Sequence, residues 1–374
     1  MPGSNARRSA ERPSESPESA RVGRLLLKWF SRHARRFPWR SRDSGRVAGY
    51  AVWVSEVMLQ QTRTSTVVPY FRRWMREFPS LRSLAAAPTE RVLAAWEGLG
   101  YYHRAHQIHR TARLLMRRSA GRLPHTADEL RALPGIGPYT AAAIASIAYR
   151  QDEIALDGNL RRVLSRYFDV RPSTSEKARD SILIQKGNSL LPRGRAGDFN
   201  QALMDLGAQI CTPRAPRCTE CPLARSCLAL RRGTQALRRI PLRSSDLPHR
   251  TRRAAVVKRG TRVLLVRRPA GGLLAGLWEF PGVRSDRRGR TSGRHKASWA
   301  GLSLRLGRRL GVFHQTYSHF ESSVYVFEAS LKPGSLAGTS TSDRRWVPFS
   351  RLDRFPMGRV DRRIALSLVE RGQG

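Results

Sequence analysis

Four cysteines, the only ones in the chain, fall within one short stretch and could together bind a metal centre. They are Cys211, Cys218, Cys221 and Cys227, in the pattern Cys-x6-Cys-x2-Cys-x5-Cys. Zinc sites are typically built from paired Cys-x2-Cys knuckles, and this stretch contains only one such pair. The spacing therefore favours an iron–sulfur cluster held by four thiolates. Four unrelated buried cysteines are the structural alternative.

The stretch ALPGIGPYTAAA (132–143) has the composition of a tight turn between two helices. We expect a helix to end at Leu133 and a second to begin near Pro138, which leaves the backbone N–H groups of the turn without internal partners. Such groups suit a phosphate, and Gly135 and Gly137 permit a close approach of the backbone. An ordinary helix–turn–helix connection is the alternative on local grounds.

The net charge indicates a polyanionic partner. The 69 Lys and Arg residues outnumber the 28 Asp and Glu residues, which gives a formal charge of +41, and nucleic acid is the first candidate for neutralising it. No apolar run approaches the roughly 18 residues of a membrane-spanning helix, and no signal-peptide pattern opens the chain. We expect a soluble monomer without membrane contact, cytoplasmic and, in a bacterium, associated with the nucleoid.

The hydrophobic pattern divides the chain into two domains. Stretches such as RVLAAWEGL, TAAAIASIAY and NQALMDLGA repeat apolar residues every three or four positions, which predicts helices. Later stretches such as AAVV, VLLV and SSVYVFEA are short apolar runs between turns, which predicts a sheet. We expect a disordered tail (1–20), an all-α domain (21–230) that includes the cysteine motif (211–227), a linker (231–250) and an α+β domain (251–374).

Several motifs together resemble one enzyme family. They are FPWR (37–40), VWVSEVMLQQT (52–62), GLGYY (98–102), the PGIG hairpin, LDGN (156–159), FNQALMDLGA (199–208) and the cysteine motif. In this combination the chain resembles the helix-hairpin-helix, iron–sulfur DNA glycosylases, and within them the MutY family of adenine-specific enzymes. The resemblance implies a helical glycosylase domain with a [4Fe-4S] cluster on the four cysteines. It also implies double-stranded DNA containing A:8-oxoguanine or A:G mispairs as the partner and substrate.

The residue after the hairpin bears on the reaction type. In the related strand-cutting glycosylases a lysine at this place attacks the sugar as an amine and forms a Schiff base. This chain has Tyr139 there, and no lysine occurs between Lys28 and Lys177. We therefore expect a monofunctional enzyme without strong lyase activity on the abasic site. The alternatives are a glycosylase/lyase for oxidised pyrimidines and a non-catalytic iron–sulfur DNA-binding protein.

Base removal without an amine needs a proton for the departing purine and an anion beside the sugar cation. Glu56 lies in the apolar stretch VWVSEVML, which should raise its pKa and keep it protonated. Asp157 in LDGN should begin a helix, whose free N–H groups favour the ionised form. The resemblance makes Glu56 the acid and Asp157 the stabilising anion, and it implies that Tyr139 and Asn159 organise the two.

The resemblance also implies residues that contact DNA. The adenine pocket would be lined by Trp39, Arg40, Leu59 and Gln201. Gln60 and Tyr101 would wedge into the duplex. Backbone groups of Gly135, Ile136 and Gly137 would bind a phosphate.

The α+β domain resembles a Nudix fold through GGLLAGLWEFPG (271–282). The acid-rich helix expected next is replaced by VRSDRRGRTSGRHKASW, which lacks the carboxylates that would bind magnesium. We therefore expect the domain to recognise a lesion and not to hydrolyse nucleotides. The resembling family reads 8-oxoguanine with a Phe-Ser-His segment, which is Tyr317, Ser318 and His319 here, so the first position differs.

Overall fold

The computed structural model describes residues 17–41, 48–172, 175–238, 247–284, 301–333 and 342–371. Contacts divide the chain into two compact units, one from Met1–Gln60 and Arg122–Leu242, the other from Gln61–Gly121 and Arg243–Gly374. Within the described ranges, no helix is long and apolar enough to cross a membrane. The stretches 1–16 of the predicted tail, 239–246 of the predicted linker and 285–299 after the Nudix-like motif lie outside the described residues.

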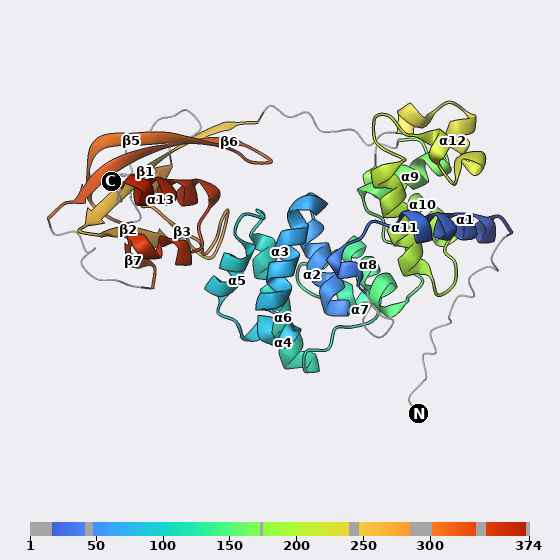
Figure 1. Ribbon diagram of the computed structural model, residues 1–374, viewed down its shortest axis with the longest axis horizontal. Coiled ribbons are helices and arrows are strands. Elements are labelled where there is room, and N and C mark those ends of the chain that lie inside the picture. The colour runs from blue at the N-terminus through green and yellow to red at the C-terminus, as the bar shows by residue number, and fades with distance from the viewer. Residues whose placement is uncertain are drawn as a thin grey trace. The chain divides into compact units, whose positions relative to one another are not determined.

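The first unit is helical (Figure 1). Its longer helices are α1 (Pro17–His33), α2 (Gly49–Leu59), α8 (Pro138–Tyr149), α9 (Gly158–Tyr167), α10 (Glu176–Asn188) and α11 (Ala196–Gln209). Its shorter ones are η1 (Pro38–Arg40), α7 (Ala127–Arg131), η2 (Cys218–Glu220), η3 (Ala224–Ser226), α12 (Leu228–Arg231) and η4 (Gln235–Arg238). Helix α8 begins with Pro138 in its first turn, where a missing N–H costs nothing, and continues with five alanines that favour helix.

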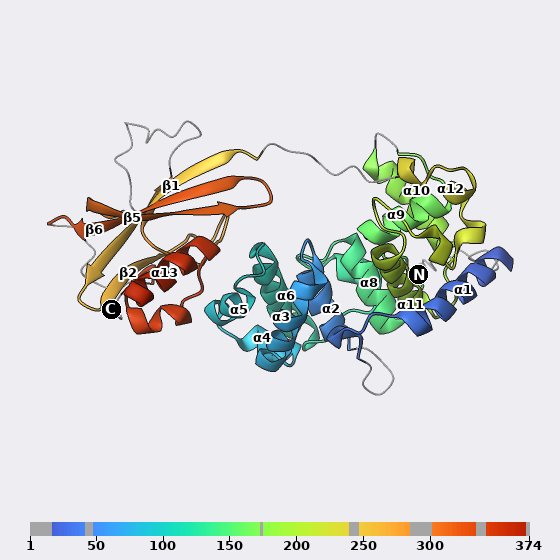
Figure 2. The same ribbon diagram turned by 45° about the horizontal axis from the view of Figure 1, so that its top comes forward.

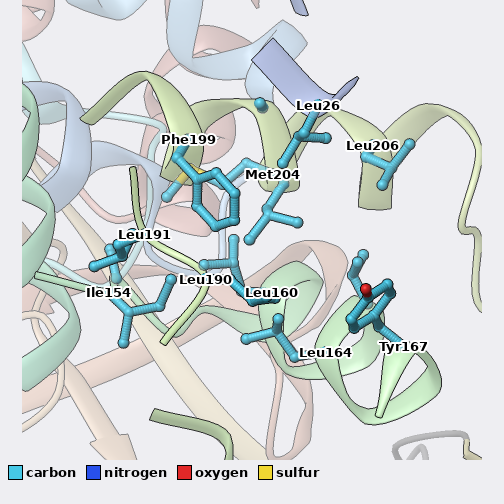
Figure 3. Close-up of a cluster of buried hydrophobic side chains, with 14 of the residues drawn as sticks. Leu26, Ile154, Leu160, Leu164, Tyr167, Leu190, Leu191, Phe199, Met204 and Leu206 are labelled. Atoms are coloured by element: carbon cyan, nitrogen blue, oxygen red, sulfur yellow. The ribbon is translucent and has the colours of Figure 1, made fainter. Parts of the chain in front are cut away.

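A hydrophobic cluster holds α1, α9 and α11 together. Figure 3 shows Leu26 of α1, Leu160 and Leu164 of α9, and Phe199 and Leu206 of α11 in this cluster. All five are at most 1% exposed, and close packing of this kind makes the relative positions of the helices rigid. The residues at the start of α9 are therefore held firmly.

Two parts of the predicted boundaries differ from the structure. Residues 17–20, predicted as part of a disordered tail, form the first turn of α1, and Ser19 is buried. Residues 235–238 of the predicted linker form η4, where Arg238 donates to Asp169 at 2.7 Å. This arginine contact joins residues far apart in the sequence, so the hydrophobic periodicity of the segment could not reveal it.

The second unit combines helices with the sheet. The helices are α3 (Thr64–Glu77), α4 (Leu81–Ala86), α5 (Thr89–Trp96), α6 (His103–Ser119), η5 (Phe349–Arg354) and α13 (Arg359–Arg371). The strands are β1 (His249–Arg259), β2 (Arg262–Arg267), β3 (Trp278–Glu279), β4 (Gly282–Arg284), β5 (Leu304–Thr316), β6 (Glu321–Leu331) and β7 (Arg344–Pro348). The predicted runs AAVV, VLLV and SSVYVFEA lie in β1, β2 and β6, which confirms an α+β region.

The sheet has the order β3-β2-β1-β6-β5, with β4 paired to β1 and β7 paired to β2. Strands β1 and β6 are parallel and the other pairs are antiparallel. Alternate residues of β1 enter two separate clusters, Ala254 and Val256 on one face, Ala255 and Val257 on the other. Helix α13 covers the first of these faces (Figures 1 and 2). The β5–β6 hairpin places residues 317–320 at the end of two long strands.

Candidate functional site

Glu56 and Tyr139 form a hydrogen-bonded pair in the first unit. Glu56 lies on α2 and is 4% exposed, and Tyr139 is the second residue of α8. The Tyr139 hydroxyl donates to Glu56 Oε2 at 2.5 Å. Helices α2 and α8 therefore bring together a carboxyl group and a phenol that are 83 positions apart in sequence.

The pKa of Glu56 is raised from 4.5 to about 7. Burial is the largest cause, because an ionised carboxylate loses its hydration there, and the negative charge of Asp157 adds to the effect. The Tyr139 hydrogen bond and the charge of Arg40 act in the opposite direction. The sequence prediction of a raised pKa is confirmed, and near neutral pH this carboxyl group can hold a proton or release one.

Asp157 is the N-cap of α9, as predicted. Its Oδ1 accepts from the Leu160 backbone N–H at 2.7 Å, and its Oδ2 accepts from Asn159 Nδ2 at 2.9 Å. These bonds lower the pKa of Asp157, but burial raises it by more, so the net shift is upward. The prediction that Asp157 begins a helix is confirmed. The prediction that its surroundings favour the ionised form is wrong, because burial disfavours a charged carboxylate.

Asn159 is held between Asp157 and Arg162. Its amide nitrogen donates to the Asp157 carboxylate, and its carbonyl oxygen accepts from Arg162 Nη2 at 2.9 Å. Gly207 of α11 lies directly against it, because a Cβ at that position would come within 2.7 Å of the Asn159 Cβ. The amide orientation is therefore fixed from both sides.

The turn of the predicted hairpin begins two residues earlier in the structure than the sequence indicated. Helix α7 ends at Arg131 and not at Leu133, and turn-type hydrogen bonds continue to the Ile136 N–H. Gly135 adopts φ +77°, a left-handed conformation that favours glycine, and Gly137 is the N-cap of α8 with φ −83°. A Cβ at Gly137 would meet nothing within 4 Å, so the turn is open at that point. Ile136 has a buried side chain, so only its backbone is available to a ligand.

Arg40 lies beside a cavity of about 500 Å³ in the first unit. Its guanidinium donates to Asp205 at 2.8 and 3.1 Å, and Arg35 Nε donates to the same carboxylate at 2.8 Å. Gln201 of α11 lines the same cavity and donates to the Gly197 carbonyl at 3.2 Å. The structure thus brings two of the predicted adenine-pocket residues to one cavity, and Asp205 is a supporting residue that the sequence argument missed.

The other predicted pocket and wedge residues of this unit are also placed. Trp39 is buried and stacks on Phe37 with ring centroids 4.8 Å apart. Leu59 is the last residue of α2 and is half-buried. Gln60 follows it, and its side-chain nitrogen lies 3.3 Å from Thr140 Oγ1, beside Tyr139. Gln60 therefore contacts the beginning of α8 directly.

The four cysteines lie around the 3₁₀ turns η2 and η3 and beside α9. None forms a disulfide. The pKa of the Cys221 thiol is raised to about 12, mainly by burial and in part by the other three sulfurs, which places all four within electrostatic reach. In the described ranges, no three His, Cys, Asp or Glu side chains form a preformed metal-holding group. The donor set itself, four thiols without a disulfide, fits a thiolate-bound centre.

Two buried arginines of α9 contact the cysteine segment, and the sequence argument missed both. Arg166 Nη1 donates to Cys211 Sγ at 3.3 Å and to the Thr212 carbonyl at 2.7 Å. Arg162 Nε donates to the Cys211 carbonyl at 2.8 Å, and its Nη2 contacts Asn159. Because an exposed arginine and a buried one look alike in sequence, only the four-residue spacing of Arg162 and Arg166, which puts both on one face of α9, could have suggested them.

The second unit contains the remaining predicted residues. Tyr101 has φ +48° and lies in the loop between α5 and α6. Tyr317, Ser318 and His319 form the β5–β6 turn, where the Tyr317 N–H donates to the Phe320 carbonyl at 2.8 Å and the two rings stack. Both segments line one cavity of about 550 Å³. The sequence analysis considered Tyr101 and residues 317–319 separately, whereas the fold places them around the same cavity.

Comparison with known families and proteins agrees with this arrangement. Residues 54–186 match the HhH-GPD superfamily of base excision DNA repair proteins, and residues 253–367 match the NUDIX domain. The rat adenine DNA glycosylase is 36% identical over 379 residues, covering 87% of this chain and 73% of the rat protein. The adenine DNA glycosylase of Schizosaccharomyces pombe is 30% identical over 427 residues, covering 95% and 91%.

Among solved structures, a thermostable thymine-DNA glycosylase superposes with a TM-score of 0.51 at 26% identity. The match covers 57% of this chain and 97% of that protein. A likeness of this degree supports a common helical glycosylase fold and leaves the choice of base to the site residues.

Proposed function

Because this chain belongs to the adenine DNA glycosylases of the HhH-GPD superfamily, we propose that it hydrolyses the N-glycosidic bond of adenine opposite 8-oxoguanine or guanine. The observation that carries the proposal is the hydrogen-bonded site of Glu56, Tyr139, Asp157 and Asn159, in which Glu56 is buried and the other three are half-buried. It contains a proton donor and an anion, which are the two groups that base loss requires.

Glu56 is the proton donor in this mechanism. With a pKa of about 7 it is largely protonated just below neutral pH, and it can protonate the departing adenine. After base loss the same carboxylate can accept a proton from the attacking water. Tyr139 holds the carboxyl group in place through its 2.5 Å hydrogen bond.

Asp157 stabilises the sugar cation. Its two oxygens are oriented by Leu160 N–H and Asn159 Nδ2, so the carboxylate is positioned before the substrate arrives. The like charges of Glu56 and Asp157 make the doubly ionised state unfavourable, so one proton resides on the pair near neutral pH. That is the state in which one carboxyl group can donate a proton while the other remains an anion.

We propose a monofunctional reaction that leaves an intact abasic site. Tyr139 occupies the position after the hairpin, and a phenol whose pKa is raised by burial and by Glu56 is a poor nucleophile. No lysine is available between Lys28 and Lys177 to form a Schiff base.

We propose that Cys211, Cys218, Cys221 and Cys227 hold a [4Fe-4S] cluster. Four free thiols within electrostatic reach, bordered by the cationic Arg166, support this assignment. When bound, the cluster would cross-link the segment after α11 and attach it to α9.

We also propose that the β5–β6 turn reads the base opposite the adenine. Ser318 and His319 are exposed and polar, and Tyr317 presents an aromatic face stacked on Phe320. The aromatic character of the first position is retained although the sequence has tyrosine there. Each polar contact to a base is worth about 1–3 kcal/mol of discrimination.

The test is single-turnover base release from duplexes that contain A:8-oxoguanine, A:G or thymine glycol. We expect adenine release from the first two, with a preference for 8-oxoguanine, and no release of thymine glycol. The products should contain abasic sites that break only after alkali, and borohydride should trap no covalent complex. Efficient trapping, or release of the oxidised pyrimidine, would overturn the proposal.

Lesion reading is tested with Ser318→Ala/His319→Ala and with Ser350→Ala, an exposed serine of η5, as the matched control. The double variant should lose most of its preference for A:8-oxoguanine over A:G, while its saturated rate on A:G changes little. An unchanged preference would remove the turn from lesion recognition.

A further inference from the structure

A carboxylate joins the helical segment of the second unit to its sheet domain. Glu97 directly follows α5, and its side chain accepts from Arg362 Nε at 2.6 Å and from Arg362 Nη2 at 3.0 Å. Glu97 Oε2 also accepts from the Met357 N–H at 3.1 Å. We name Glu97, Arg362 and Met357 the latch. Both charged side chains are about four-fifths buried, at 21% and 20% exposed, so the pair is less screened than a surface ion pair.

Arg362 is a rigid partner for Glu97. Its Nη1 donates to the Leu352 carbonyl at 2.7 Å, and its Nη2 donates to the Phe355 carbonyl at 2.6 Å. The guanidinium therefore uses its planar set of donors on Glu97 and on the backbone of η5 at once. A change in the Glu97 contact is transmitted to the sheet domain and not absorbed by a mobile side chain.

The same loop is attached a second time at its other end. The Tyr102 hydroxyl donates to the Met357 carbonyl at 3.3 Å and accepts from the Gly98 N–H at 3.3 Å. Tyr102 is 6% exposed. Met357 thus binds Glu97 through its N–H and Tyr102 through its carbonyl, so both ends of the loop 97–102 meet one residue.

The loop between these attachments has little freedom. Gly98, Gly100 and Tyr101 all have positive φ, at +99°, +73° and +48°. The Gly100 carbonyl accepts from Trp96 Nε1 at 3.0 Å and from Arg104 Nη2 at 3.2 Å. A tightly bonded loop of this kind moves as one body, so the position of Tyr101 follows the position of Glu97.

Tyr101 and the β5–β6 turn line the same cavity of about 550 Å³. The cavity is formed by the loop 98–103 on the helical side, by residues 272–274 and 315–319 on the sheet side, and by Arg359 at the beginning of α13. Arg359 lies three residues before Arg362 of the latch, on the same helix. The latch therefore lies next to residues that line this cavity, because Glu97 directly precedes Gly98 and Arg362 lies one helical turn after Arg359.

We propose that Glu97 is a positioning residue for lesion preference: its bond to Arg362 and Met357 sets the spacing between Tyr101 and the turn of Tyr317, Ser318 and His319. The inference rests on the proposed function and deepens it. A wedge and a reading turn can act on one base pair only when their spacing matches the duplex, and interactions that fix such spacing act on discrimination more than on the chemical step.

Other contacts keep the two parts of this unit together when the latch is broken. Trp278 Nε1 donates to Glu90 Oε1 at 3.2 Å, and His106 Nε2 lies 3.0 Å from the Ala275 carbonyl oxygen. Loss of Glu97 alone should therefore leave the unit folded while relaxing the alignment at the cavity.

The experiment compares wild type with Glu97→Gln and Glu97→Ala, and with Glu77→Ala as the matched control. Glu77 pairs with Arg91 on the same unit, but both side chains are substantially exposed. Base release under single turnover is measured at saturating enzyme on A:8-oxoguanine and on A:G. We expect Glu97→Ala to lower the preference for A:8-oxoguanine about tenfold, the effect of losing one charge-assisted bidentate bond. Glu97→Gln should give a smaller loss because the amide still accepts from Met357, and Glu77→Ala should give none.

A second arm separates positioning from general destabilisation. Adding Glu97→Ala to Ser318→Ala/His319→Ala should cause no further loss of preference, because the turn that the latch positions no longer reads the lesion. The inference is wrong if Glu97→Ala keeps the wild-type preference, or if both substrates slow by the same factor. A wild type without any preference would instead refute the proposed lesion specificity, and the latch would lose its role with it.

Discussion

Replacing Glu56 with glutamine should make the first unit more stable at high pH while abolishing base release. Gln keeps the size of the side chain and can still accept the hydrogen bond of Tyr139, but it has no proton to donate and no charge to bury. Stability should therefore rise while base release is lost. Replacing a residue that merely supports the fold would lower both, so the combination identifies a catalytic acid.

The magnitude follows from the pKa of Glu56. It rises from 4.5 to about 7 on folding, so the folded state binds the extra proton between these values and wild-type stability falls as pH rises through that window. The loss is complete above about pH 7 and absent below about pH 4.5. Each pKa unit is worth about 1.4 kcal/mol, so the stability of Glu56→Gln relative to wild type should increase by about 2–3 kcal/mol between pH 5 and pH 8.

The assay is thermal unfolding of wild type, Glu56→Gln and the exposed control Glu77→Gln across this pH range. For units of this size the difference in Tm between Glu56→Gln and wild type should widen by about 5–10 °C from pH 5 to pH 8. Glu77→Gln should release adenine at the wild-type rate. A constant difference in Tm would refute the raised pKa, and normal base release by Glu56→Gln would remove the residue from the mechanism.

Three further predictions concern neighbouring residues. Tyr139→Phe removes a hydrogen bond that lowers the pKa of Glu56, so the alkaline limb of the pH–rate profile should move to higher pH; an unchanged or lower limb would contradict the assigned contact. Cys221→Ser should abolish the broad visible absorbance expected of an iron–sulfur cluster and weaken DNA binding, whereas a colourless wild type with stoichiometric zinc would overturn the cluster. Asp205→Asn leaves Arg35 and Arg40 without their buried anion and should destabilise the first unit by about 3–5 kcal/mol in denaturant unfolding. The control Asp198→Asn should cost less than about 1 kcal/mol, because its partner Arg195 is exposed.

The sequence was most informative where chemistry depends on residue type and local spacing. The cysteine motif, the PGIG turn and the missing lysines are properties of short stretches, so they could be read without knowing the fold. The N-cap role of Asp157 was predictable for the same reason, because a cap is decided by its own next three residues. The strands β1, β2 and β6 were equally visible, since their apolar runs are local.

Prediction failed where electrostatics or long-range contacts decide the outcome. The upward shift of the Asp157 pKa depends on burial by distant segments, and the ordering of residues 17–20 depends on the packing of α1. The arginine-rich strand β5 was not singled out, because its partner β6, and not its own composition, makes it a strand.

The sequence by itself determined which reactive groups this protein carries in its motifs: two acids, a phenol after the hairpin, and four thiols. Only the tertiary structure decided how they are used. Glu56 meets Tyr139 across 83 positions, Arg40 meets Asp205 across 165, and Glu97 meets Arg362 across 265. A pKa or an ion pair depends on distance and burial, and neither is defined until folding brings remote segments together.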